Sequence, residues 1–266
     1  MTESDDGYLR LRETFDEDAG RYDRARPRYP APMFGDLDAA GVATGARVLE
    51  IGCGTGQATV PLAERGYRIV AVELGAELAA LARRNLAGFG SVEVVTAAFE
   101  QWPLPAEPFD LVFSATAFHW LDPAVRVPKS ADALRSGGLL ATVATHHIAG
   151  GTEVFFREVQ GLYERFDPAT PPGLRLRPAR DIPEDDRELA SSDRFGPASF
   201  SRYEWELQYS TAEYLDLLLT YSGHRALPQA QQHALLTAIG QLIDADYGGH
   251  IVKRYLTELR IAQRIR

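Results

Sequence analysis

The string VLEIGCGTG at Val48–Gly56 limits the fold of this chain more than any other feature of its sequence. A short apolar run that ends in alternating glycines, Gly52, Gly54 and Gly56, predicts a strand followed by a sharp turn. Glycine lets the backbone turn there and approach a ligand without a clash from Cβ. From Gln57 onward the pattern predicts a helix whose first N–H groups face the turn. The string therefore predicts a binding site of the nucleotide type at the carboxyl edge of a sheet.

Short apolar runs recur after this turn, and helical segments separate them. Such near-continuous runs suit strands that are buried on both faces of a sheet. The predicted strands are Val48–Ile51, Ile69–Val72, Val92–Val95, Leu111–Phe113 and Leu139–Val143, and the predicted helices are Gln57–Arg65, Ala76–Leu86 and Ala124–Arg135. Strands that alternate with helices predict an α/β fold with a doubly wound, mostly parallel sheet.

The flanking regions follow other patterns. Apolar residues about one turn apart predict a helix over Tyr8–Tyr22, and the prolines of RPRYPAP predict extended chain through Pro32. After residue 150 we expect a helix, a long loop rich in proline and charge, a strand, two helices and a last segment that is either strand or helix. The helix is expected over Glu153–Phe166, the loop over Asp167–Phe195, the strand over Phe200–Tyr209 and the last segment over Ile251–Ile261.

These patterns predict one domain over residues 1–266. Its parts are an N-terminal helical cap (1–45), a binding core (46–145) and a C-terminal part (146–266) with a helical insertion, a lid-like loop (167–195) and the last strands. A loop of that length in a compact domain is typical of a functional lid or of disorder.

Composition narrows the class of protein. The single cysteine, Cys53, excludes an intramolecular disulfide framework and a cysteine-based zinc site, and it fits a reducing compartment such as the cytoplasm. No apolar run is long enough to span a bilayer, so we expect no membrane partner. The net charge of −9 opposes binding to a phosphate backbone, so a small molecule is a better partner than nucleic acid. The sequence does not determine the oligomeric state.

Glu73 ends the strand that follows the glycine turn. A carboxylate at that place can accept hydrogen bonds from two ribose hydroxyls. A dinucleotide fingerprint needs glycine at position 57, where this chain has Gln57. A nicotinamide-dependent oxidoreductase is therefore the less favoured hypothesis, and neither lysine, Lys129 or Lys253, forms a Tyr-x-x-x-Lys pair.

With Glu50 before the glycines, EIGCGTG resembles motif I of the class I S-adenosylmethionine-dependent methyltransferases. FDLVFSATAFHWLD (Phe109–Asp122) resembles their fourth strand, and LRSGGLLATV (Leu134–Val143) resembles the turn into the fifth. YDRARPRYP (Tyr22–Pro30) is similar to the small-molecule branch that includes trans-aconitate-methyltransferase-like proteins and the type 11 methyltransferase domain. The resemblance is strong over Phe15–Val143.

This resemblance implies a Rossmann-like sheet of seven strands, with the last one antiparallel. It also implies methyl transfer from S-adenosyl-L-methionine, which leaves as S-adenosyl-L-homocysteine, to a small-molecule acceptor and without a metal. The methyl could go to oxygen, nitrogen or carbon.

The resemblance also assigns cofactor contacts. The first-strand acid and the turn would hold the methionine moiety, Glu73 would hold the ribose, and Leu74 and Ser114 would lie at neighbouring strand ends. Relatives usually carry an acid after the third strand for adenine, where this chain has alanines. The Phe99 backbone and the Glu100 carboxylate are the expected substitutes, although Phe99 fits a plain core position equally well. The expected turn residues are Glu50, Gly52, Gly54, Thr55, Gly56 and Gln57.

Two tyrosines of the proline-rich string complete the expected cofactor set. The aromatic faces of Tyr22 and Tyr29 could attract the sulfonium and exclude water. Tyr22 fits the apolar stripe of the N-terminal helix equally well. The arginines between them, Arg24, Arg26 and Arg28, could receive an acidic substrate, but pairing with nearby acids is more common.

His119 is the candidate catalytic base, which is needed only if the acceptor must lose a proton. It follows the fourth strand, where open α/β sheets place substrates. With Trp120 and His146 it forms the expected substrate pocket, although His119 and Trp120 could simply anchor the next helix. His146 and His147 are adjacent, so only one should face the pocket. The missing adenine acid keeps a regulatory protein that binds the cofactor without catalysis as a further hypothesis.

Overall fold

The computed structural model describes residue 16 and residues 18–265, which divide into two compact units. We call one the sheet unit, made of Arg28–Thr145, Glu184–Tyr203 and the chain from Thr257 onward. The other is the helical unit, made of the described residues up to Pro27 together with His146–Pro183 and Glu204–Leu256. Each unit thus combines three separate segments of the chain. The division at residues 45 and 145 that the sequence suggests stays a prediction.

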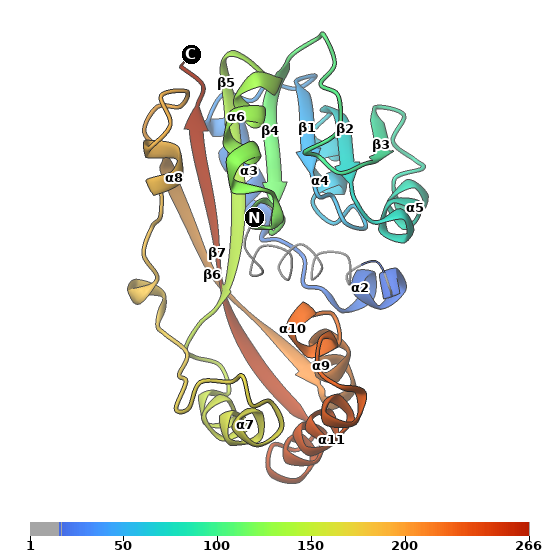
Figure 1. The fold of residues 1–266 in the computed structure, drawn as a ribbon, viewed down its shortest axis with the longest axis vertical. Helices are drawn as coiled ribbons and strands as arrows, with labels where there is room; N and C mark the ends of the chain where they lie inside the picture. Colours follow the sequence, from blue (N-terminus) through green and yellow to red (C-terminus); the bar gives the residue numbers. More distant parts are fainter. Residues whose placement is uncertain (1–15, 17, 266) are drawn as a thin grey trace. The chain divides into compact units, whose positions relative to one another are not determined.

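The described residues form a seven-stranded sheet in the order β3-β2-β1-β4-β5-β7-β6 (Figure 1). Neighbours from β3 to β5 run parallel, as when Leu49 pairs with Val70 and with Val112. Along β5 and β7 the partners run in opposite directions, because Gly137 bonds to Arg264 and Ile148 to Arg254. The strands are β1 (Arg47–Ile51), β2 (Arg68–Glu73), β3 (Val92–Thr96), β4 (Phe109–Ala115), β5 (Leu134–His147), β6 (Ser199–Ser210) and β7 (His250–Gln263). The doubly wound, mostly parallel fold is confirmed.

In the sheet unit the core lies on both faces of the sheet, because successive strand residues point to opposite sides. Val48 packs with one hydrophobic cluster, whereas Leu49 and Ile51 pack with the other. Helices α3 (Ala31–Ala39), α4 (Thr59–Glu64) and α5 (Ala76–Asn85) supply the first cluster, and α6 (Pro123–Ala133) and α8 (Arg187–Ala190) supply the second. Both faces are covered, which explains why the strands read as unbroken apolar runs.

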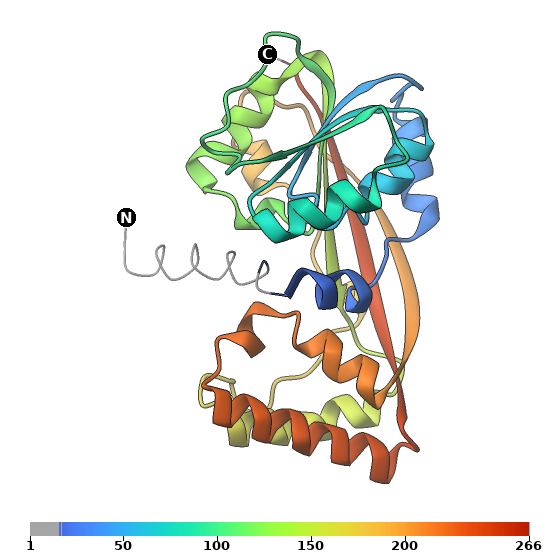
Figure 2. The same cartoon turned by 90° about the vertical axis from the view of Figure 1, so that its right-hand side faces the viewer.

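The helical unit has its own core of aromatic and aliphatic side chains. Phe155 and Ile239 are fully buried there, on α7 and α11. Those two helices lie side by side, as Figure 2 shows for the long red-orange α11 and the yellow-green α7. The helices of this unit are α2 (Ala19–Ala25), α7 (Glu153–Phe166), η3 (Ala179–Asp181), α9 (Thr211–Leu218), α10 (Ser222–Arg225) and α11 (Gln229–Asp246).

Several predicted elements differ from the structure. The chain is helical from Ala31, and Pro32 lies in the first turn of α3, where its missing N–H costs nothing. The helix after the glycine turn begins at Thr59 instead of Gln57. Three helices, α9 to α11, stand where two were expected, and the ambiguous Ile251–Ile261 is strand β7. The N-terminal helix appears as α2, and the part of its expected stripe at Leu11 and Phe15 lies outside the described residues.

Candidate functional site

The glycine turn at the end of β1 has the backbone that its sequence predicts. The φ angles of Gly52, Gly54 and Gly56 are +70°, +57° and +92°, in the left-handed region that favours glycine. A Cβ on Gly52 would collide with the Ala117 Cβ, and one on Gly56 would lie 3.2 Å from the Leu86 Cδ1. Glycine is therefore needed at Gly52 and Gly56 both for conformation and for close packing.

Glu73 fastens this turn to the end of β2. Its Oε2 accepts a hydrogen bond from the Gly54 N–H at 2.8 Å, and its Oε1 accepts one from the Gly75 N–H at 2.9 Å. The side chain thus links the glycine turn to the end of β2 and the start of the next loop.

Glu50 is a buried carboxylate at the end of β1. It is 1% exposed, and its Oε2 has no hydrogen-bond partner among the described residues. Burial raises the pKa of Glu50 to about 7; the Thr59 hydroxyl lowers it somewhat, and the charge of Glu73 adds to the increase. A buried acid of this kind is stabilised by a cationic donor, so the site favours a ligand that carries one.

The turn also presents a buried amide. Gln57 is buried, and within the described part of the chain its Nε2 has no hydrogen-bond partner. Thr55 is buried as well, and its carbonyl accepts a bond from the Asn85 Nδ2 at 2.9 Å. Among the described residues, the turn therefore leaves one carboxyl oxygen, on Glu50, and one amide donor, on Gln57, unsatisfied.

Thr116 joins the site from the end of β4, although its sequence gave no sign of it. Its φ of +53° makes it the one non-glycine residue with positive φ in the described part of the chain. Such a conformation is strained for a β-branched residue, and strain of this kind clusters at functional sites. The Thr116 hydroxyl donates to the Ala115 carbonyl at 2.8 Å, so the Tyr29 hydroxyl, also 2.8 Å away, donates to Thr116. The structure thus brings Tyr29 to the edge that carries the glycine turn.

Other expected cofactor residues are occupied by contacts within the protein. The Ser114 hydroxyl donates to the Ile51 carbonyl at 2.9 Å and so links β4 to β1. Phe99 is buried in a hydrophobic cluster, and Leu74 is half-buried. The Glu100 carboxylate accepts a bond from the Asp122 N–H at 3.2 Å. Cofactor roles for these four residues stay predictions.

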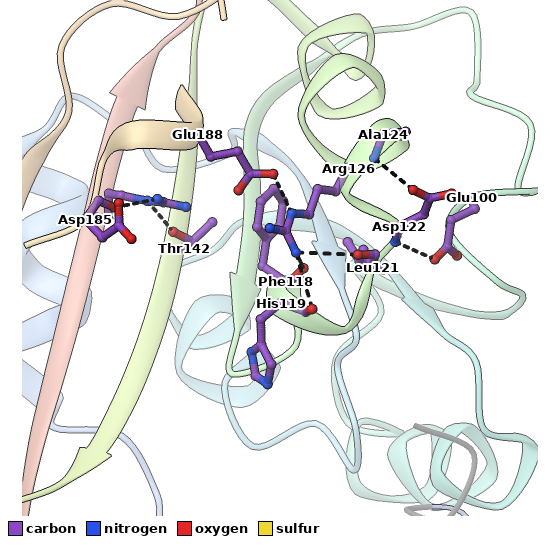
Figure 3. Close-up of polar contacts among 11 residues, drawn as sticks. Glu100, Phe118, His119, Leu121, Asp122, Ala124, Arg126, Thr142, Asp185 and Glu188 are labelled. Atoms are coloured by element: carbon purple, nitrogen blue, oxygen red, sulfur yellow. Dashed lines mark hydrogen bonds and ion pairs between the residues drawn. The ribbon is translucent and has the colours of Figure 1, made fainter. Parts of the chain in front are cut away.

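His119 lies in a short turn, η2 (Phe118–Trp120), directly after β4. Its side chain is exposed, and its ring centroid lies 5.0 Å from that of the half-buried Trp120. Arg126 of α6 holds the turn, because its Nη1 donates to the carbonyls of Phe118, His119 and Leu121 at 3.3–3.5 Å. Figure 3 shows the His119 ring pointing away from this cluster of contacts.

The same arginine connects the turn to the segment after residue 183. The Arg126 Nε donates to the Glu188 Oε1 at 2.6 Å (Figure 3). Nearby, Arg260 donates to the Thr142 hydroxyl at 3.1 Å and to the Asp185 carbonyl at 2.8 Å. The later part of the expected lid-like loop, from Glu184, is therefore fixed to the sheet unit, whereas its earlier part belongs to the helical unit.

Two expected site residues, Tyr22 and His146, belong to the helical unit. Tyr22 lies on α2, where the Arg26 guanidinium is 5.0 Å from its ring centroid, and His146 is half-buried near the end of β5. Their contribution to the site stays a prediction. Cys53 is buried in the turn, and burial raises the pKa of its thiol, so it remains protonated.

The described residues contain no group of three or more His, Cys, Asp or Glu arranged to hold a metal ion. Among the same residues, none of the helices combines the length and the apolar character that a bilayer crossing requires.

Comparison with known proteins agrees with this geometry. Residues 49–142, which include the glycine turn, Glu73 and the His119 turn, match the family model described as a methyltransferase domain. Over these residues the chain is therefore similar to a methyltransferase domain. The chain is 37% identical over 130 residues to an uncharacterized methyltransferase of Mycobacterium tuberculosis, a match that covers 49% of this chain and 51% of that protein.

It is also 35% identical over 119 residues to the trans-aconitate 2-methyltransferase of Azoarcus sp. (strain BH72), covering 44% and 46% of the two chains. The chain therefore spans about half the length of the curated relatives it matches. A solved structure extends the likeness beyond this domain. The putative type II methyltransferase from Anaeromyxobacter dehalogenans is similar with a TM-score of 0.60 and 25% identity, over 90% of this chain and 98% of that one.

Proposed function

We propose that this protein is an S-adenosylmethionine-dependent methyltransferase that acts on a small molecule. The observation that carries the proposal is the pair of unsatisfied buried groups at the glycine turn of the methyltransferase domain. The Glu50 oxygen needs a cationic donor, and the Gln57 amide needs an acceptor. The amino-acid end of S-adenosylmethionine carries both, as an ammonium and a carboxylate.

The other proposed contacts to S-adenosylmethionine would lie at the ends of neighbouring strands. The backbone at Gly52 and Gly54 would face the methionine moiety, as the resemblance to motif I implies. Glu73 would accept the ribose hydroxyls at the end of β2. Tyr29 would present its ring to the sulfonium, in the orientation that its bond to Thr116 holds.

When bound, the cofactor supplies a methyl group on a positively charged sulfur, which is a good leaving group. The protein then has to align the acceptor with that methyl and exclude water. His119 would take the proton from an acceptor that must lose one, and Arg126 would keep its turn in place. An acceptor that is already ionised needs no such base.

A small-molecule acceptor fits the charge of the protein better than nucleic acid does. The net charge of −9 opposes approach of a phosphate backbone to the surface as a whole.

Calorimetric titration with S-adenosylmethionine, S-adenosylhomocysteine and a nicotinamide dinucleotide tests the cofactor. We expect the first two to bind and the third not to bind. Absence of binding at millimolar S-adenosylmethionine would contradict the proposal, and preference for the dinucleotide would favour an oxidoreductase.

Catalysis needs a separate measurement. We expect S-adenosylhomocysteine to form when candidate acceptors are added to protein and cofactor. Binding of the cofactor without product for any acceptor would instead indicate a regulatory protein.

A further inference from the structure

Lys253 is a buried cation in the helical unit, far along the sequence from the methyltransferase domain. It lies on β7 and is 3% exposed. Its Nζ donates to the Tyr221 hydroxyl at 3.0 Å. The same atom lies 5.1 Å from the Tyr221 ring centroid and 5.2 Å from that of Tyr255. Its surroundings are thus aromatic.

No acidic side chain of the described residues lies within 4.0 Å of the Lys253 ammonium. Instead a second cation is near, because the Arg26 guanidinium lies 4.7 Å from the Tyr221 ring centroid. Burial acts to raise the pKa of Tyr221, but the charges of Lys253 and Arg26 outweigh it and lower that pKa overall. Positive charge therefore dominates around this tyrosine.

His147, at the end of β5, adds a second unsatisfied group. Its Nε2 is buried and has no hydrogen-bond partner within the described part of the chain. Its ring centroid lies 6.3 Å from that of Tyr255. Burial and the charge of Lys253 lower the pKa of His147 to about 2, so the imidazole is neutral and adds no positive charge.

These contacts do not balance the cost of burying an ammonium. An ammonium has three donors, and among the described residues Lys253 makes one hydrogen bond, to the Tyr221 hydroxyl. The cation–π attraction of the Tyr221 and Tyr255 rings offsets a part of the free energy of hydration that the ammonium loses on burial. Desolvation of an ion without a counter-ion costs more free energy than such contacts supply. An anionic group at Lys253 would supply the missing charge.

We propose that Lys253 of β7, together with His147 of the neighbouring strand β5, binds the carboxylate of a small-molecule ligand in the helical unit. One negative charge with two acceptor oxygens matches one ammonium and its free donors. The neutral imidazole can donate a further hydrogen bond from its unpartnered nitrogen. This site goes beyond the proposed methyl transfer and does not depend on it.

Calorimetric titration of the full chain with acetate, succinate, benzoate and citrate tests the proposal, with succinamide and benzamide as uncharged controls. We expect at least one carboxylate to bind and both amides to fail. Lys253→Met should weaken that binding about tenfold to a hundredfold, the range for loss of a charge-assisted hydrogen bond. Equal binding of an acid and its amide, equal affinity of the variant, or no binding of any acid would overturn the proposal.

Arg254→Met is the matched control on the same strand. Arg254 already pairs with Glu204 at 2.9 Å, so its loss should leave carboxylate affinity unchanged. Without ligand, Lys253→Met should melt at the same temperature as the wild type or higher, because it removes an unpaired buried charge. A lower melting temperature would show that the protein itself compensates the ammonium, and it would overturn the proposal.

A last measurement identifies the source of the carboxylate. Formation of S-adenosylhomocysteine with the bound acid would identify it as the methyl acceptor, and binding without product would identify a non-reacting ligand. Both results support the site. If S-adenosylmethionine does not bind at all, the carboxylate titrations still stand, so the two proposals can fail separately.

Discussion

The buried Glu50 carboxyl predicts that cofactor affinity depends on pH. Its pKa is about 7 without ligand, raised from 4.5 mainly by burial. If S-adenosylmethionine binds as proposed, its ammonium requires the ionised form of Glu50, so below pH 7 binding must displace a proton. At pH 5 only about 1% of the carboxyl is ionised, against about half at pH 7. If the ammonium restores the ordinary pKa, affinity should rise about 40-fold between pH 5 and pH 7.

Glu50→Gln is the matched variant, because it keeps the shape and removes the titration. Its affinity should be weaker at pH 7 and nearly constant over the same interval. Calorimetric titrations of both proteins with S-adenosylmethionine at pH 5, 6 and 7 measure the difference. Any change in the protonation of the ligand itself affects both proteins equally and cancels in the comparison. Parallel pH profiles for the two proteins would refute the reasoning.

The same group should affect stability without ligand, with a definite sign. A carboxyl whose pKa is raised in the folded state favours folding at low pH, and that contribution is lost as the pH rises from 4.5 through 7. The loss amounts to about 3 kcal/mol in the free energy of unfolding. Urea denaturation should therefore show a steeper decrease with pH for the wild type than for Glu50→Gln.

Three further variants test the rest of the site. Gly52→Ala should lower the free energy of unfolding by more than about 1 kcal/mol, because φ is positive there and the new Cβ would collide with Ala117. Gly88→Ala is the control and should not lower it by that amount, because the space around Gly88 is open. Urea denaturation of the two variants measures the difference. His119→Ala should lower turnover and leave cofactor affinity unchanged, as rates and calorimetry will show, and equal loss of both would indicate a structural role. Glu188→Gln should cost less than about 1 kcal/mol of stability but should lower kcat by loosening Arg126, and an unchanged kcat would exclude that positioning role.

The sequence predicted most of the sheet unit because its signals are local. The apolar runs of β1 to β5 and the glycines at 52, 54 and 56 each require only neighbouring residues to take effect. The extended chain predicted through Pro32 was wrong at Ala31 and Pro32, for the opposite reason. Proline ends a helix in its interior but is tolerated in the first turn, and only packing of Met33 and Leu37 decides that α3 forms there.

The resemblance to methyltransferases could also be predicted from the sequence, because motif I and Glu73 are recognised from the spacing of residues along the chain. The family comparison then confirmed it over residues 49–142. What the sequence could not predict were the partners of each side chain. It assigned Glu73 to a ribose, a role that stays a prediction, and the structure shows this carboxylate bonded to the Gly54 and Gly75 amides.

Tertiary structure alone decided which polar groups are left unsatisfied. Glu50 and Gln57 were visible as motif residues, but their lack of partners among the described residues and the raised pKa of Glu50 follow from burial among distant segments. Likewise, the strained Thr116 and the buried Lys253 carry no local signal. A sequence determines spacing and propensity, whereas desolvation and charge balance depend on every chain segment that packs around a group.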